Sequence, residues 1–433
     1  MKRFLNTLAL SAATALALSA NSVAAQDVAL QGVTLAIGDG SEPIENATVI
    51  IRDGKVLAVG TNLATPDAIT MEVPEGSWVT PGIVAAVTNL GLWDVGAVSE
   101  SNDSRINDSS PFGPALDVAP AINPGSQHVA ISRAGGVTRA AVVGMPTDSI
   151  FTGQGAVIDL GADAQPITQA RAFQGVMIGE RGARIAGGSR IATHVTLRNA
   201  IAEASAYAAG RWEGEEALLT RVDAAALGPV IAGRQKLFVH AERASDIRQV
   251  IALKREFPRL DIVITGASEG WTLASEIAAS GIPVIASSLQ DLPERFEQLA
   301  STQSNIGRMT RAGVKVAIDA SSMRQPRQLA QHAGNLVALT RIPRASGLTW
   351  GQALAAITSV PADILGMKGK FGTLSRGAAG DLVIWDGDPL EVSSAPTNVF
   401  IDGVEQPLGN HQSRLRERYR DLDETALPKA YDW

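Results

Sequence analysis

The chain of 433 residues contains no cysteine and only five histidines. The lack of cysteine excludes disulfide bonds, cysteine nucleophiles and thiolate metal ligands. A chain of this length can still bury a large apolar core without disulfides. Because histidines are few, any imidazole-based metal site must draw on a small set, which is His128, His194, His240, His332 and His411.

Basic charge is also scarce, since 37 lysines and arginines face 44 acidic residues and the formal net charge is −7. An acidic surface repels polyanions and anionic membranes. We therefore expect no nucleic-acid partner and no binding to a charged membrane surface.

The first 25 residues have the composition of a secretory signal peptide. Lys2 and Arg3 form a basic start, residues 4–20 are apolar and rich in alanine and leucine, and Val23 and Ala25 are the small residues that precede a cleavage site. We expect cleavage after Ala25, a periplasmic location and no membrane span in the mature chain.

Alternating β-branched segments predict strands near both ends of the chain, at residues 28–36, 47–59 and 371–403. A hairpin turn is expected at Asp53-Gly54. Residues 151–159 lack the lysine of a phosphate-binding loop and are interpreted as a glycine-supported turn between strands.

From Lys236 onward, short apolar strands alternate with amphipathic helices, beginning with a strand at 237–240 and a helix through 247–254. This alternation is typical of βαβ units and a parallel sheet, and in a domain of this size it favours a barrel. We therefore predict an α/β fold in which a TIM-like (β/α)8 barrel is inserted in a small composite β-sandwich domain formed by both chain ends.

Four segments resemble the amidohydrolase superfamily, nearest to its imidazolonepropionase-like branch: residues 45–60, 80–82, 358–366 and 372–385. They consist of turn glycines, a helix start and strand residues, so they indicate the fold more directly than an activity. With the sequence patterns, the resemblance implies five segments: a signal peptide at 1–25, the first part of a β domain at 26–80, a metal-dependent-hydrolase-like barrel at 81–368, the second part of the β domain at 369–410, and a C-terminal tail at 411–433.

The resemblance implies a metal site, and the first barrel strand has lost its ligands. In the family this strand reads Pro-Gly-hydrophobic-hydrophobic-Asp-x-His-x-His. Here Ala85 stands at the aspartate position, and Val87 and Asn89 stand at the two histidine positions. Valine cannot bind a metal, and asparagine binds Zn²⁺ poorly compared with imidazole.

The other ligand positions are retained only in part. His240 matches the fifth-strand histidine, although a histidine at the end of a buried strand can also be a hydrogen-bonded core residue. The sixth-strand histidine falls at Ser268. The eighth-strand catalytic aspartate falls at Ser321 by ungapped matching, or at Asp319 if the alignment shifts by two residues. The bridging residue of the fourth strand is not placed, and none of the other four histidines is assigned to a metal; His128 is expected at the surface.

Catalytic zinc normally needs about three protein ligands and an open position. We therefore favour a periplasmic family member that is degenerate at the metal site and needs no cofactor. It would bind a small molecule or act as the non-catalytic partner of an active paralogue or of a second copy of itself. The alternative is an active hydrolase of non-peptide carbon–nitrogen bonds, in cyclic amides or dipeptide-like molecules, with a single divalent metal such as zinc near His240 and Asp319. A purely structural role is a third interpretation.

Overall fold

The computed structural model describes residues 25–65, 69–105, 109–215, 217–323 and 325–420. The expected signal peptide, apart from Ala25, and the end of the expected C-terminal tail lie outside the described residues. Within the described part, no helix combines the length and apolar character that crossing a membrane requires.

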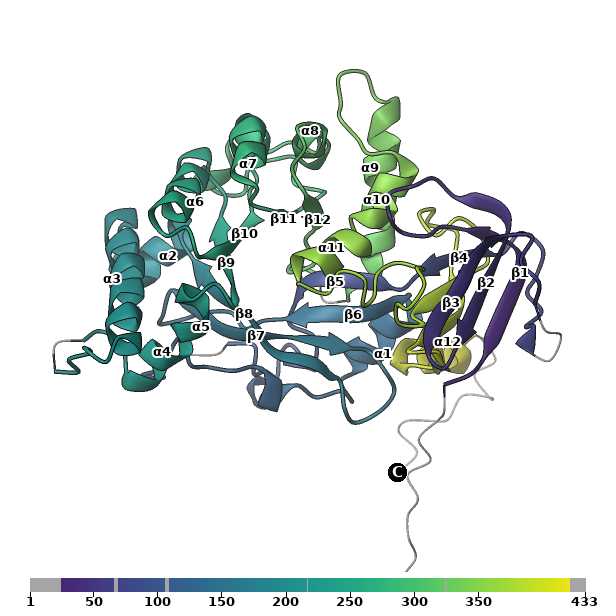
Figure 1. Ribbon diagram of the computed structural model, residues 1–433, viewed down its shortest axis with the longest axis horizontal. Coiled ribbons are helices and arrows are strands. Elements are labelled where there is room, and N and C mark those ends of the chain that lie inside the picture. Colours follow the sequence, from purple (N-terminus) through teal and green to yellow (C-terminus); the bar gives the residue numbers. More distant parts are fainter. Residues whose placement is uncertain (1–24, 66–68, 106–108, 216, 324, 421–433) are drawn as a thin grey trace, which may run out of the picture.

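Eight strands of the described chain form a barrel-like sheet in the order β12-β11-β10-β9-β8-β7-β6-β5 (Figure 1). Their bounds are β5 Ile83–Thr88, β6 Val137–Val142, β7 Phe151–Asp159, β8 Ile167–Met177, β9 Lys236–Ala241, β10 Asp261–Gly266, β11 Val284–Ala286 and β12 Val316–Ile318.

Most helices lie outside this sheet and connect its strands. They are α1 Gln127–Ala134, α2 Gly179–Ile185, α3 Arg190–Ala208, α4 Arg221–Ala226, α5 Gly228–Ile231, α6 Ala244–Glu256, α7 Ala274–Ser280, α8 Asn305–Arg311, α9 Leu329–Ala338, α10 Trp350–Ala355, α11 Ser359–Ile364 and α12 His411–Tyr419. Short 3-10 turns occur at Ser99–Ser101, Ala119–Ala121, Gly270–Leu273, Phe296–Gln298, Pro326–Gln328 and Leu339–Arg341.

The predicted alternation of strands and helices is confirmed from β9 to β12. These four strands are parallel neighbours. The helix expected at 247–254 lies within α6, and α7 ends at Gly281, whose φ of +68° is the left-handed conformation that favours glycine at a helix end.

The predicted (β/α)8 pattern is wrong for the middle of the sheet. Strand β7 is antiparallel to both β6 and β8, and no helix separates these strands. The physical reason is connection length, because a parallel crossover needs roughly a dozen residues or more whereas a short loop joins antiparallel neighbours. Residues 151–159, interpreted from the sequence as a turn, are β7 itself.

The two edge strands of this sheet, β5 and β12, are joined through the segment between α10 and α11. The Val84 N–H donates to the Ile357 carbonyl at 2.8 Å, and the Ile318 N–H donates to the Ala356 carbonyl at 3.0 Å. Residues 356–357 therefore nearly close the barrel by lying between its two edges.

A second sheet has seven strands in the order β15-β14-β13-β4-β1-β2-β3. Their bounds are β1 Val28–Leu35, β2 Ile44–Arg52, β3 Lys55–Thr61, β4 Trp78–Pro81, β13 Leu382–Trp385, β14 Pro396–Ile401 and β15 Val404–Glu405. Strands from the two ends of the chain meet where β4 pairs with β13. The strands form one continuous hydrogen-bonded sheet, and the strand order does not show the two separate sheets of a sandwich. The hairpin at Asp53-Gly54 is confirmed, with φ of +49° and +73°.

A buried ion cluster joins the two sheets. Arg139 on β6 binds Asp381, which directly precedes β13, through two hydrogen bonds of 2.7 and 2.9 Å. It also pairs with Asp402 at 2.7 Å and lies 3.9 Å from Asp159. Burial raises the pKa of Asp159 to about 6, against the hydrogen bond from the Gly161 N–H and the charge of Arg139. Arg139 thus links a barrel strand to the second sheet through buried ionic hydrogen bonds.

Candidate functional site

A β-bulge at the end of β5 directs the two substituted positions into the barrel. Ala85 pairs with Ala140 and Thr88 pairs with Val142, so an advance of three residues along β5 spans only two residues along β6. Ala85 packs in the core outside the barrel, whereas Val87 joins the apolar cluster inside it. Because a bulge re-aims the residues that follow it, both Val87 and Asn89 line the same cavity.

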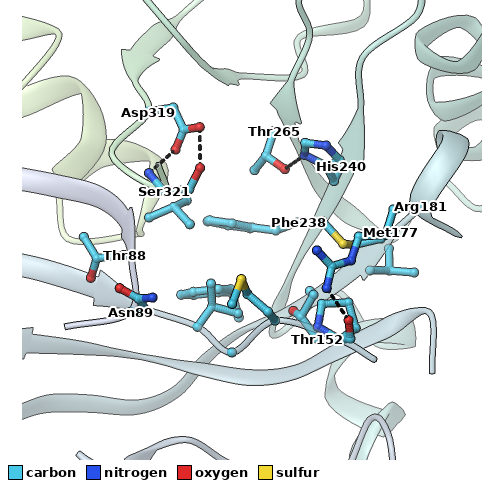
Figure 2. A pocket seen from close by; sticks show the side chains of 18 residues that line it. Thr88, Asn89, Thr152, Met177, Arg181, Phe238, His240, Thr265, Asp319 and Ser321 are labelled. Carbon is cyan, nitrogen blue, oxygen red and sulfur yellow. Dashed lines mark hydrogen bonds between the residues drawn. The ribbon is translucent and has the colours of Figure 1, made fainter. Parts of the chain in front are cut away.

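This cavity has a volume of about 190 Å³ and lies where the carboxyl ends of the parallel strands converge (Figure 2). Five of the six candidate site residues from the sequence line this cavity: Val87, Asn89, His240, Asp319 and Ser321. The sixth, Ser268, is not among the lining residues. The polar lining residues are Thr88, Asn89, Thr152, Arg181, His240, Thr265, Asp319 and Ser321, and the apolar ones are Val87, Val143, Met145, Pro146, Phe173, Val176, Met177 and Phe238.

Two stacked phenyl rings separate the cavity from the barrel core. The ring centroids of Phe173 on β8 and Phe238 on β9 are 4.2 Å apart with an interplanar angle of 16°. Both side chains belong to the apolar cluster inside the barrel. The wall that a bound molecule would meet here is therefore flat and apolar.

His240 is half-buried and has protein neighbours at both ring nitrogens. Nδ1 lies 3.3 Å from the Thr265 hydroxyl on the adjacent strand, and Nε2 lies 3.4 Å from the Glu242 carboxylate. Met177, at the end of the fourth strand of the sheet, is the residue directly opposite His240. Met177 also lines the cavity, so the side chain beside His240 on this strand is a thioether.

Asp319 and Ser321, the two candidates for the eighth-strand aspartate position, both line the cavity. The Ser321 N–H donates to one carboxylate oxygen of Asp319 at 2.8 Å, and the Ser321 hydroxyl donates to the other at 2.7 Å. Burial raises the pKa of the Asp319 carboxyl group, against these two hydrogen bonds. The pair forms a closed local turn at the cavity rim.

Ser268 lies behind the cavity, where it supports Glu242. Both the N–H and the hydroxyl of Ser268 donate to one Glu242 oxygen, at 2.9 and 2.5 Å. The residue of β10 that reaches the cavity is Thr265. The position assigned to the sixth-strand histidine thus serves a buried carboxylate that in turn faces His240.

The amide oxygen of Asn89 accepts a hydrogen bond from the indole N–H of Trp93 at 2.9 Å. The Trp93 ring stacks on His128, with centroids 4.1 Å apart. The expectation that His128 is exposed is wrong: it is buried, because α1 packs its first turn against the loop after β5, and its Nε2 lies 2.9 Å from the Asp94 carbonyl.

Sequence reasoning missed Arg181 and Thr152. Arg181 lies on α2, just after the end of β8, which is a position from which barrel proteins commonly build their sites. Thr152 lies at the start of β7, and it reaches the cavity mouth because β7 runs antiparallel to its neighbours. Only knowledge of the strand directions could have identified Thr152.

Polar side chains that converge on one cavity at the carboxyl face of a barrel sheet are typical of TIM-like barrel proteins. Comparison with known proteins narrows this class. Residues 272–405 match the amidohydrolase family Amidohydro_3. The chain is 26% identical over 395 residues to the imidazolonepropionase of Maricaulis maris (strain MCS10), covering 82% of this chain and 90% of that protein.

A 60-residue segment, 14% of this chain, is 48% identical to the amidohydrolase tasK of Hapsidospora irregularis, but it spans only 6% of that protein. Among solved structures, an amidohydrolase from Thermotoga maritima MSB8 superposes with a TM-score of 0.77 at 25% identity, over 87% of this chain and 99% of that chain. A molinate hydrolase shares the fold, with a TM-score of 0.55 at 16% identity over 89% of this chain and 95% of that one. Together these matches support the amidohydrolase superfamily, with imidazolonepropionase among the proteins that this chain resembles.

Proposed function

We propose that this protein binds a small organic molecule in the barrel cavity and has lost metal-dependent hydrolysis. The observation that carries the proposal is that Val87 and Asn89 both line the cavity at the end of β5. The resemblance assigns these two residues to the positions of the family's histidine pair. The side-chain oxygen of Asn89, a weak zinc ligand, already accepts a hydrogen bond from the Trp93 indole N–H. This oxygen is therefore directed toward the protein.

The other potential metal ligands in the cavity support the same proposal. Both carboxylate oxygens of Asp319 accept hydrogen bonds from Ser321, and His240 lies between Thr265 and Glu242. Within the described residues, no three His, Asp or Glu side chains are grouped so that they could hold a metal ion. Zinc sites of hydrolases use about three such ligands, and this set of residues does not fit one.

The second candidate is an active hydrolase of carbon–nitrogen bonds other than peptide bonds, with a single divalent metal. It is favoured by one observation, which is that His240 and Asp319 line the same cavity. Metal content distinguishes the two candidates, because the hydrolase needs a bound ion to lower the pKa of its attacking water.

We expect protein purified without chelator to contain far less than one equivalent of zinc. We expect the double variant Val87→His/Asn89→His, which restores the histidine pair beside His240 and Asp319, to bind about one equivalent. Added zinc at about 100 times the Kd would then stabilise the variant by roughly 2.7 kcal/mol. Metal analysis by mass spectrometry and thermal melts with and without zinc measure both effects.

Val87→Ala/Asn89→Ala is the matched control, because it changes the same positions without adding ligands. Stoichiometric metal in the unaltered protein, together with loss of that metal in His240→Ala, would contradict the proposal and support the hydrolase.

We further propose that the mature protein is periplasmic and associates with an active paralogue or with a second copy of itself. The composition of residues 1–25 supports the location. Several large apolar side chains exposed on the loop after β11 support association: Leu289, Leu292, Phe296 and Leu299. We expect the protein isolated from its native periplasm to begin at Gln26 and to elute above monomer mass. An uncleaved amino terminus would contradict the first point, and a strictly monomeric mass the second.

A further inference from the structure

Three side chains at one wall of the cavity form a line from a hydroxyl through an imidazole to a carboxylate. Thr265 Oγ1 lies 3.3 Å from His240 Nδ1, and His240 Nε2 lies 3.4 Å from Glu242 Oε1. Thr265 and His240 stand directly opposite each other on the paired strands β10 and β9, and both line the cavity (Figure 2). In many enzymes this order of groups activates the hydroxyl as a nucleophile.

The carboxylate at the far end of this line is held in place. Glu242 is 6% exposed, and its Oε2 atom accepts hydrogen bonds from the N–H and the hydroxyl of Ser268 at 2.9 and 2.5 Å. These two bonds leave Oε1 as the oxygen that faces His240. A carboxylate fixed in this way can orient an imidazole and stabilise its protonated form.

The backbone beside Thr265 leaves room for this carboxylate. Gly266 has a φ of +89°, which is in the left-handed region that favours glycine. A Cβ atom at this position would lie 2.8 Å from Cδ and from Oε1 of Glu242. A larger residue would therefore displace the carboxylate from the space that it occupies beside His240.

The neighbours of His240 favour one tautomer of its ring. An ionised carboxylate only accepts hydrogen bonds, so the ring proton belongs on Nε2, which faces Glu242. Nδ1 then has the free lone pair and faces the Thr265 hydroxyl, which can donate its proton. A general base needs this arrangement before it takes a proton from a nucleophile.

We propose that Thr265 is a nucleophile that cleaves small aryl esters without a metal, with His240 as its general base and Glu242 as a positioning residue. This activity goes beyond the proposed function, and it rests on that function because it uses the same cavity. An aryl group suits the flat wall formed by the stacked rings of Phe173 and Phe238, since aromatic rings pack well in offset stacks.

The reaction has two steps, in which His240 carries the proton. In the first step, Thr265 Oγ1 bonds to the acyl carbon and its proton passes to His240 Nδ1. The bond from the acyl carbon to the aryl oxygen breaks, and the phenolate leaves with the electron pair and takes the proton from His240. In the second step, water attacks the acyl-threonine and gives one proton to His240. The acyl–Oγ1 bond breaks, Thr265 recovers that proton, and the carboxylic acid departs.

The test incubates the full mature chain with 4-nitrophenyl acetate in the presence of a zinc chelator. We expect a rapid burst of about one equivalent of 4-nitrophenolate, because the acyl-enzyme forms before it is hydrolysed. Absorbance measures the burst. Peptide mapping by mass spectrometry should place the acetyl group on Thr265.

Four variants separate the roles of the three residues. Thr265→Val keeps the shape and removes the hydroxyl, so it should lose both the burst and the acetyl group, whereas Thr265→Ser should retain both. In His240→Gln we expect acylation to slow by about 100- to 10,000-fold, the usual contribution of a positioned general base. Glu242→Gln should slow acylation without changing the half-saturating ester concentration, which a general disturbance of the cavity would also change.

Thr272→Val is the matched control, because Thr272 is an exposed threonine shortly after β10 and does not line the cavity. It should keep the burst of the unaltered protein, and circular dichroism should show all variants folded. The inference is overturned by the absence of a burst, by acetylation only at other residues, by a burst that persists in Thr265→Val, or by loss of activity in the chelator. Activity that the chelator abolishes would also contradict the proposed function, whereas a metal-free protein without a burst would overturn this inference alone.

Discussion

Replacing Arg139 with methionine is expected to lower the free energy of unfolding by about 3–5 kcal/mol, the usual cost of leaving a buried ionic partner unpaired. Arg139 is 4% exposed and Asp381 is 2% exposed. Without the guanidinium, the Asp381 carboxylate would lose both its charged hydrogen bonds and keep only the one from the Asp402 N–H. Urea unfolding monitored by tryptophan fluorescence measures the change.

The matched control is the double variant Arg139→Met/Asp381→Asn, which removes both charges and keeps an oxygen that can accept from the Asp402 N–H. Replacing a buried ion pair by uncharged groups is often close to neutral, so the double variant should recover much of the lost stability. A single variant that costs less than about 1 kcal/mol would show that Arg139 does not hold the two sheets together.

Replacing Phe238 with alanine is expected to cost about 3–5 kcal/mol, since a large apolar side chain is deleted from a packed interior. Phe238 is 4% exposed and stacks on Phe173. The same change should enlarge the cavity, because the ring is part of its lining. We therefore expect lower stability together with binding of a bulkier naphthyl probe, 2-naphthylmethanol, that the unaltered protein excludes.

Phe238→Leu is the control, because it keeps an apolar side chain and leaves a smaller void. It should be destabilised less and should still exclude the naphthyl probe. If Phe238→Ala gained no affinity for that probe, the phenyl rings would not limit the length of the cavity. Calorimetry for binding and urea unfolding for stability give the two readouts independently.

The sequence predicted those parts of the fold whose pattern is local. Strands β9 to β12 and helix α6 have strong hydrophobic periodicity, and the Asp53-Gly54 turn has a characteristic residue pair. Strand β7 was missed because its glycines were attributed to a turn. In the structure Gly155 serves close packing, since a Cβ atom there would come within 2.2 Å of the Phe173 ring. A glycine that allows close approach and a glycine that allows a turn look the same in sequence.

Residues that line the cavity could be predicted only on strands whose sequence resembles the family's strands. Val87, Asn89 and His240 follow from such strands, and Asp319 and Ser321 from a third. Arg181 and Thr152 were not predictable, because their place in the cavity depends on the direction of β7 and on the loop between β8 and α2. Neither feature leaves a periodic trace in the sequence.

The segment at 356–357 that joins β5 to β12 bears on the order in which the chain can fold. The hydrogen bonds to Val84 and Ile318 form only once residues 356 and 357 are available, and β4 gains its partner β13 only once residues 382–385 are. Although β4 also pairs with β1, and β5 with β6, the second side of each strand is paired only by a segment near the other end of the chain. Such distant pairings slow folding because loop closure precedes any gain in contacts. A chain cut before residue 356 would leave β4 and β5 each without a partner on one side, so both sheets are completed only by the carboxyl-terminal part of the chain.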